Sequence, residues 1–221
     1  CHTFSRDEGI EGYFLISAHI ILNHGYVMPL TIRYLAMEAS IPVSPLLRLI
    51  LRALIDNFQH KLAGIDLNER MEVYENRDQL YLVMLDDFKS CFDIIEKTLL
   101  EWLHKYKASA RLIHAARCIL QLDRAFCPRY GQQQQVELTL DFNARPIKKQ
   151  LDAMELPHSE SFNPCDNQHL EKITVNIPGG VGSFLTGPDG GSWVRGELMD
   201  PEQSLISLNA VTESPDVIVV G

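Results

Sequence analysis

Two histidines and a cysteine in the C-terminal third are the residues best suited to bind a metal. They are His158, Cys165 and His169, in the stretch HSESFNPCDNQH. A zinc site needs three or four nitrogen or sulfur donors that converge tetrahedrally. The spacing fits no common zinc motif and a fourth ligand is missing, so we predict no metal and keep these three as weak candidates.

Two further stretches contain residue types that can bind phosphate groups or their metal ions. Asp86, Asp87 and Asp93 bring to mind aspartate-rich helices that bind magnesium diphosphate, but the spacing differs, and a solvated helix face explains them better. The glycine-rich stretch 177–191 lacks the GK[ST] ending of a phosphate-binding loop and is typical of turns. GxSxG, HExxH and GxGxxG do not occur in a usable context. We therefore predict no catalytic residue and no cofactor, without excluding an enzyme whose site assembles in space.

Composition and charge narrow the classes of partner. The chain has 221 residues, with 20 lysines and arginines against 29 aspartates and glutamates, a formal net charge of −9. Proteins that grip phosphate backbones usually carry a basic face, so direct nucleic-acid binding is disfavoured. No apolar run approaches the roughly 20 residues of a membrane span.

The five cysteines are odd in number and form no CxxC pair, which indicates a reducing compartment, nucleus or cytoplasm. Because the chain starts at Cys1, we expect a fragment, a processed product or a trimmed chain.

The first 64 residues are predicted to form a helical unit. The stretch 12–25, GYFLISAHIILNHG, is apolar nearly all round and predicts a buried helix. Pro29 suits the first turn of a second helix. Ser44 followed by Pro45 predicts the N-cap and first turn of a third helix, which Gly64 would end.

Residues 30–56 resemble a helix-turn-helix. Ala36 would take the small-residue position where its two helices approach closely, and Leu46 and Leu49 fall at apolar positions. Ser40 stands where that family commonly has glycine. The face that would read DNA bases carries Leu47 and Leu51, where a reader needs polar groups. We therefore keep a transcriptional regulator as an alternative only and expect Leu47 and Leu51 to contact a protein partner.

Residues 77–127 are predicted to form a long antiparallel helix pair. One apolar face repeats at spacings of four and three and is expected to run along a single helix. Its members are Tyr81, Leu85, Phe88, Phe92, Ile95, Leu99, Trp102 and Tyr106. A second face runs from Ala108 to Phe126 out of phase with the first, which predicts a turn near 105–108.

Beyond residue 132 the pattern changes to period two. Alternating stretches at 136–142 and 172–177 predict half-buried strands, with short strands suggested at 183–185 and 192–194. The region 132–221 is thus expected to contain β-structure and to end in a strand at 216–220.

The terminal stretch SPDVIVVG resembles a SUMO-interacting motif. Asp216 and the branched residues Val217, Ile218, Val219 and Val220 carry the resemblance. It implies that the tail adds a strand to the SUMO sheet, with its acidic flank against basic residues. A strand of the chain's own sheet is the alternative, and strands at 136–142 and 173–177 would offer that sheet.

The sequence as a whole predicts an α+β fold, with a predominantly helical body (a bundle or a repeat) and a β-rich C-terminal third. We expect an intracellular, non-enzymatic interaction or scaffold subunit of a larger complex, joined to its partners or to a second copy through helical faces. The resemblance of the tail suggests nuclear genome maintenance by analogy alone. An enzyme fragment with a metal loop at 158–169 remains an alternative.

Overall fold

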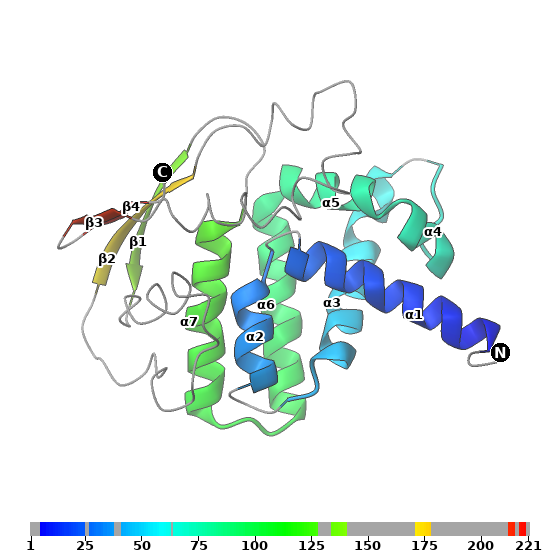
Figure 1. Ribbon diagram of the computed structural model, residues 1–221, viewed down its shortest axis with the longest axis horizontal. Coiled ribbons are helices and arrows are strands. Elements are labelled where there is room, and N and C mark those ends of the chain that lie inside the picture. Colours follow the sequence, from blue (N-terminus) through cyan, green and yellow to red (C-terminus); the bar gives the residue numbers. More distant parts are fainter. Residues whose placement is uncertain are drawn as a thin grey trace.

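The computed structural model describes residues 5–24, 27–37, 41–62, 64–127, 134–140, 171–177, 212–214 and 217–219. Up to residue 127, the described residues form seven α-helices with a π-helical and a 3-10 turn, and no strand (Figure 1). The predicted helical body is confirmed. The domain boundaries predicted from the sequence stay predictions, and the strands suggested at 183–185 and 192–194 lie outside the described residues.

Helix α1 (Arg6–His19) begins at a capping box. The Ser5 hydroxyl accepts the Glu8 N–H at 3.2 Å, and the Glu8 carboxylate accepts the Ser5 N–H at 2.7 Å. The helix continues into η1 (Ile20–His24), a π-helical turn. The prediction of a helix buried all round is wrong, since Tyr13 and Ile16 are 41% and 47% exposed. Helix α1 lies at the surface, with the ring of Tyr13 tilted against that of Tyr74.

Helix α2 (Pro29–Met37) begins at the predicted proline. Helix α3 (Val43–Phe58) begins one residue before Ser44, with Pro42 at the N-cap, so the predicted cap at Ser44 is wrong. Helix α3 runs into the 3-10 turn η2 (Gln59–Lys61). Gly64 then adopts a φ of 82°, a left-handed conformation that glycine takes without strain, and the turn leads on toward α4.

The predicted unbroken helix between Tyr81 and Tyr106 is wrong. Helices α4 (Arg70–Glu75) and α5 (Arg77–Asp86) precede a break, and α6 (Phe88–Lys105) begins after it. The helix is interrupted at Asp87, where the backbone takes the non-helical angles φ −108° and ψ 58°. The Asp87 carboxylate accepts the Ser90 N–H, at the start of α6, and the Lys61 ammonium. These hydrogen bonds hold the pKa of Asp87 below its usual range, with Lys61 as the largest cause.

Helices α6 and α7 (Ala110–Phe126) run antiparallel. Arg117 pairs with Glu96 at 2.9 Å, and Arg124 pairs with Asp93 at 3.5 Å, so residues further along α7 meet residues further back on α6. The predicted turn between the two helices is found at residues 106–109, where Lys107 has a φ of 54°.

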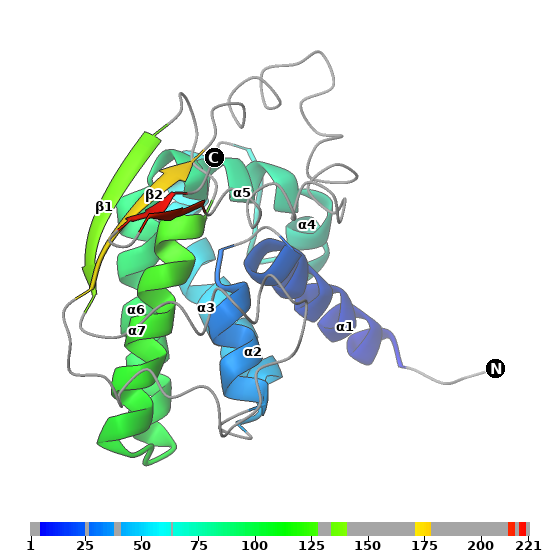
Figure 2. The ribbon, with the colours of Figure 1, turned by 60° about the vertical axis from the view of Figure 1, so that its left-hand side comes forward.

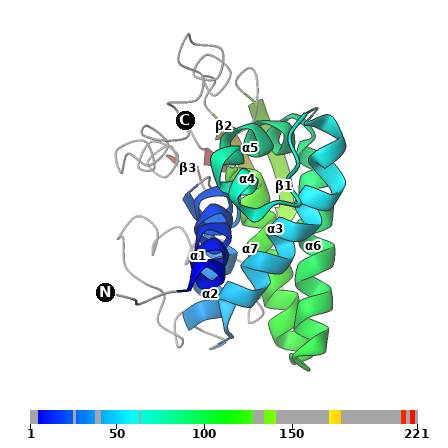
Figure 3. The same ribbon diagram turned by 90° about the vertical axis from the view of Figure 1, so that its right-hand side faces the viewer.

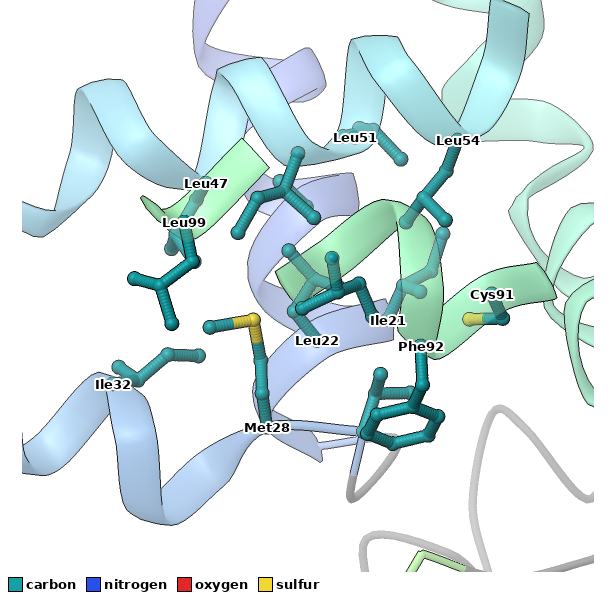
Figure 4. Packing of buried hydrophobic residues seen from close by; sticks show 14 of the residues in the cluster. Ile21, Leu22, Met28, Ile32, Leu47, Leu51, Leu54, Cys91, Phe92 and Leu99 are labelled. Atoms are coloured by element: carbon teal, nitrogen blue, oxygen red, sulfur yellow. The ribbon is translucent and has the colours of Figure 1, made fainter. Parts of the chain in front are cut away.

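One apolar core joins the helices. Its residues come from η1 and all seven helices, and Figure 4 shows α3 meeting α6 and the segment around Met28. Leu47 and Leu51 are 4% and 0% exposed and point into this core. They pack there because α3 directs its widest apolar face at α6.

Two antiparallel strand pairs are described beyond the helices. Strand β1 (Gln134–Leu140) pairs with β2 (Glu171–Ile177), Val136 opposite Val175, and both lie beside α7 (Figure 2). Strand β3 (Thr212–Ser214) pairs with β4 (Val217–Val219), Glu213 opposite Ile218. The terminal stretch therefore pairs with its immediate neighbour β3 rather than joining the β1–β2 ladder.

Candidate functional site

The candidates for chemistry in the C-terminal third are not placed by the structure. His158, Cys165 and His169 lie outside the described residues, as do Asp216 and Val220. Val217, Ile218 and Val219 lie in β4. Within the described part of the chain, no three histidine, cysteine or acidic residues are grouped to hold a metal ion.

The structure corrects which side chains of α3 face outward, and the helix-turn-helix resemblance itself stays an expectation. Leu47 and Leu51, expected on an exposed face, are core residues, so the expectation that they contact a partner is corrected. Ala36, expected at a close helix approach, is exposed, and Leu49, expected inside, is 45% exposed. The outer face of α3 is the one that bears Arg48, Leu49 and Arg52.

A pocket of about 370 Å³ opens on that outer face. Helix α1 packs on α3 and α4, and α3 packs on α6, so four helices contribute to its lining (Figure 3). We call it the cationic pocket, and its lining residues are Glu11, Phe14, Pro45, Arg48, Leu49, Arg52, Arg70, Trp102 and Lys105. Its volume falls in the range of pockets that bind small ligands or a few side chains.

Two guanidinium groups of the cationic pocket share one aromatic ring. The Cζ atoms of Arg52 and Arg70 lie 5.3 Å and 5.8 Å from the centre of the Phe14 ring. Both distances suit cation–π attraction. Because Phe14 is 3% exposed, the ring is fixed by the core and holds both guanidinium groups at the pocket wall.

Glu11 is the one carboxylate among the lining residues. It forms an ion pair with Arg70, and its Oε2 atom lies 3.9 Å from Arg48 Nε. The second distance is too long for a hydrogen bond, and the buried Arg48 Nε has no hydrogen-bond partner among the described residues. Glu11 thus holds Arg48 and Arg70 near each other, and most of the N–H donors of their guanidinium groups remain available to a ligand.

Trp102 forms another wall. Its ring lies tilted against that of Tyr106, with ring centres 4.4 Å apart, and its side chain is 6% exposed. Its buried Nε1–H finds no acceptor within the described part of the chain. An indole N–H can only donate, and a buried donor without an acceptor costs about 1–3 kcal/mol. Tyr106 and Leu49, each 45% exposed, leave apolar surface close to the pocket lining.

The charge of the pocket is opposite to that of the chain. Arg48, Arg52, Arg70 and Lys105 face the single carboxylate of Glu11, whereas the chain carries −9. Clustered like charges repel unless a counter-charge joins them. The cationic pocket is therefore suited to an anionic ligand.

The buried carboxylate of Asp123 lies outside the cationic pocket and stabilises the fold. Asp123, on α7, is 1% exposed and accepts the N–H groups of Leu30 and Thr31 at 2.9 and 2.8 Å. It therefore caps α2 from a distant part of the chain. Burial raises the pKa of Asp123 to about 7, against the lowering effect of these hydrogen bonds and of Arg33.

Sequence reasoning missed the cationic pocket, although part of it left a signal. Arg48 and Arg52 stand four apart on a helix, a like-charge pair that a free helix face disfavours. Glu11, Arg70 and Trp102 come from distant positions, and only the packing of α1, α4 and α6 brings them together.

No family model, no curated protein and no solved structure matches the chain. None of the described helices is long and apolar enough to cross a membrane.

Proposed function

We propose that this protein is a non-enzymatic interaction subunit that binds an acidic segment of a partner protein in the cationic pocket. The observation that carries the proposal is the pocket itself, which four cationic side chains and one carboxylate line on a chain of net charge −9. Charge complementarity of this kind selects a partner and speeds its encounter.

The apolar surface beside the pocket favours a protein segment over a simple ion. Leu49 and Tyr106 are each 45% exposed, and Pro45 and Trp102 complete the apolar part of the wall. A segment with acidic side chains next to apolar ones would satisfy both kinds of surface. Aromatic and arginine residues are also the types that dominate binding energy at protein interfaces.

We place this function inside the cell, in the nucleus or the cytoplasm. Cys91, Cys118 and Cys127 are buried thiols that form no disulfide within the described part of the chain, as suits a protein kept in a reducing compartment. A role within a larger complex belongs to the same proposal, because a chain that binds a partner segment in this pocket acts as one subunit of an assembly.

The test uses two matched charge reversals on one helix. Lys105→Glu changes a pocket residue, whereas Lys89→Glu changes an exposed lysine sixteen residues back on α6, about 24 Å away at 1.5 Å per residue. The probe is a fluorescein-labelled peptide of alternating glutamate and leucine, with a glutamine–leucine peptide as control. We expect Lys105→Glu to weaken binding of the acidic peptide about tenfold, and Lys89→Glu to leave it within about twofold.

Fluorescence anisotropy at low and high salt completes this test. Binding through exposed charges weakens as salt shortens the Debye length from about 30 Å at 0.01 M to about 10 Å at 0.1 M. Equal loss in both variants, or equal affinity for both peptides, would refute the proposal.

A second candidate is capture of SUMO by residues 216–220. Within the described residues, β4 forms a ladder with β3 and also lies close to β2. Addition of a SUMO strand would need an edge of β4 that neither β3 nor β2 covers. An Ile218→Asp variant should abolish the shifts that the wild-type chain causes in the NMR spectrum of labelled SUMO. Identical shifts with both chains, or none with either, would remove this candidate.

A further inference from the structure

We infer that the acidic group received by the cationic pocket is a phosphorylated side chain of the partner, an inference that rests on the proposed function. The first step is the balance of charge. Four cationic side chains and the Glu11 carboxylate leave an excess of three positive charges. A partner carboxylate would neutralise one of them, whereas a phosphoryl group carries about −1.5 to −2 at pH 7.

The second step is the geometry of the donors. Arg48, Arg52 and Arg70 supply planar guanidinium groups, which bind phosphate oxygens through paired hydrogen bonds. Arg48 and Arg70 both approach the Glu11 carboxylate, and Arg52 and Arg70 both lie over Phe14. Arg70 therefore links the other two into one cluster, which is held before any ligand arrives.

The third step is the number of donors. Arg48, Arg52 and Arg70 each carry several N–H donors, Lys105 carries an ammonium group, and all four side chains line the pocket. A phosphoryl group has three oxygens that accept hydrogen bonds, so it can serve several donors at once, which a carboxylate with two oxygens does less well.

The apolar surroundings decide between a partner segment and a free phosphate. Leu49 and Tyr106 expose large apolar surfaces beside the cationic pocket. A free phosphate or a small phosphorylated solute would leave them bare. Residues on either side of a phosphorylated serine would cover them, so the peptide should bind more tightly than its isolated phosphoamino acid.

The experiment compares three peptides that differ at one central position, which is serine, glutamate or phosphoserine between leucines. Isothermal titration calorimetry with the full chain should give an affinity for phosphoserine at least about tenfold above that for glutamate. Lys105→Gln and Arg52→Gln should each reduce this preference, and Lys89→Gln should keep it. Affinity should also fall from pH 7 to pH 5, since the second phosphate pKa is about 6.

Each other outcome is decisive. If glutamate binds as tightly as phosphoserine, the inference is wrong and the proposed function stands. If free O-phosphoserine binds as tightly as the peptide, the pocket is a site for small phosphorylated solutes, and both the inference and the proposed partner segment are wrong. If neither acidic peptide binds and O-phosphoserine does not bind either, the pocket is not an anion site, and both proposals fail.

Discussion

Asp123 and Thr31 stand 92 residues apart in the sequence and meet at one carboxylate oxygen. Asp123 Oδ2 accepts the Thr31 N–H at 2.8 Å and the Thr31 hydroxyl at 2.7 Å. Oδ1 of the same carboxylate accepts the Leu30 N–H. The start of α2 is therefore tied to α7 by a buried cap that sits at the helix N-terminus, where negative charge is favoured.

Replacing Asp123 with alanine should destabilise the fold strongly. It leaves two N–H groups and the Thr31 hydroxyl without their acceptor, and Thr31 is fully buried. We expect a loss of about 2–4 kcal/mol in the free energy of unfolding. Asp93→Ala is the matched control, because that carboxylate is 54% exposed and pairs with Arg124, so its loss should cost at most about 1 kcal/mol. Urea unfolding measures both, and equal effects would contradict the assigned role.

The same carboxyl should make stability depend on pH. Its folded pKa is raised to about 7 by burial, whereas an unfolded aspartate titrates near 3.9. Between these values the folded chain keeps a proton that the unfolded chain has lost, so the contribution of Asp123 falls as the pH rises, by at most about 1.4 kcal/mol per unit. Above about pH 7 it becomes constant.

An Asp123→Asn variant isolates this contribution, because asparagine does not titrate. The free energy of unfolding of the wild type, minus that of the variant, should decrease from pH 4 to pH 7 and then level off. A difference that stays flat over this range would show that the carboxylate is already ionised in the fold.

Two lysine-to-glycine substitutions, one in the turn between α6 and α7 and one in the middle of α6, should change the free energy of unfolding in opposite directions. Lys107 has a φ of 54°, and the N–H groups of Lys107 and Ala108 bond back to His104 and Leu103. Glycine takes this left-handed position without strain, so Lys107→Gly should raise the free energy of unfolding by about 1 kcal/mol. Lys97→Gly, in the exposed middle of α6, should lower it by about 1 kcal/mol. Thermal unfolding measures both, and a loss in both would refute the assignment of the turn.

Cys91 should be chemically inert in the folded protein. Burial, with a contribution from the Asp87 charge, raises the pKa of its thiol to about 12. Because the thiolate is the reactive form, iodoacetamide at pH 8 should leave Cys91 unmodified unless urea unfolds the chain. Mass spectrometry of the digested protein, with glutathione as an internal standard, checks this. Alkylation of Cys91 at the same rate with and without urea would contradict it.

Helical periodicity predicted the existence of the helices but not their breaks. Leu85, Phe88 and Phe92 keep helical spacing across Asp87, because α5 and α6 both turn apolar residues to the same core. The spacing therefore cannot reveal that Asp87 caps a new helix. The capping box of Ser5 and Glu8 is a local pattern that the sequence does display.

The prediction that Leu47 and Leu51 lie on the outer face of α3 is wrong for a related reason. Leucine and isoleucine occur almost all round this helix, and the sequence alone does not say which of them contact α6. The positions of Arg48 and Arg52 mark the outer face, and Leu49 between them is exposed as a result. The complete pocket was beyond prediction because it needs the relative placement of four helices.

The indole N–H of Trp102 gives the most direct test of the cationic pocket. A Trp193→Phe variant leaves Trp102 as the one tryptophan, so its Nε1–H gives a single resonance in a ¹H–¹⁵N spectrum. Addition of the phosphoserine peptide should shift this resonance, because Trp102 lines the pocket and the bound phosphoryl group changes its surroundings, and Lys105→Gln should weaken the response. A resonance that stays in place while the peptide binds elsewhere, or no binding at all, would contradict the account.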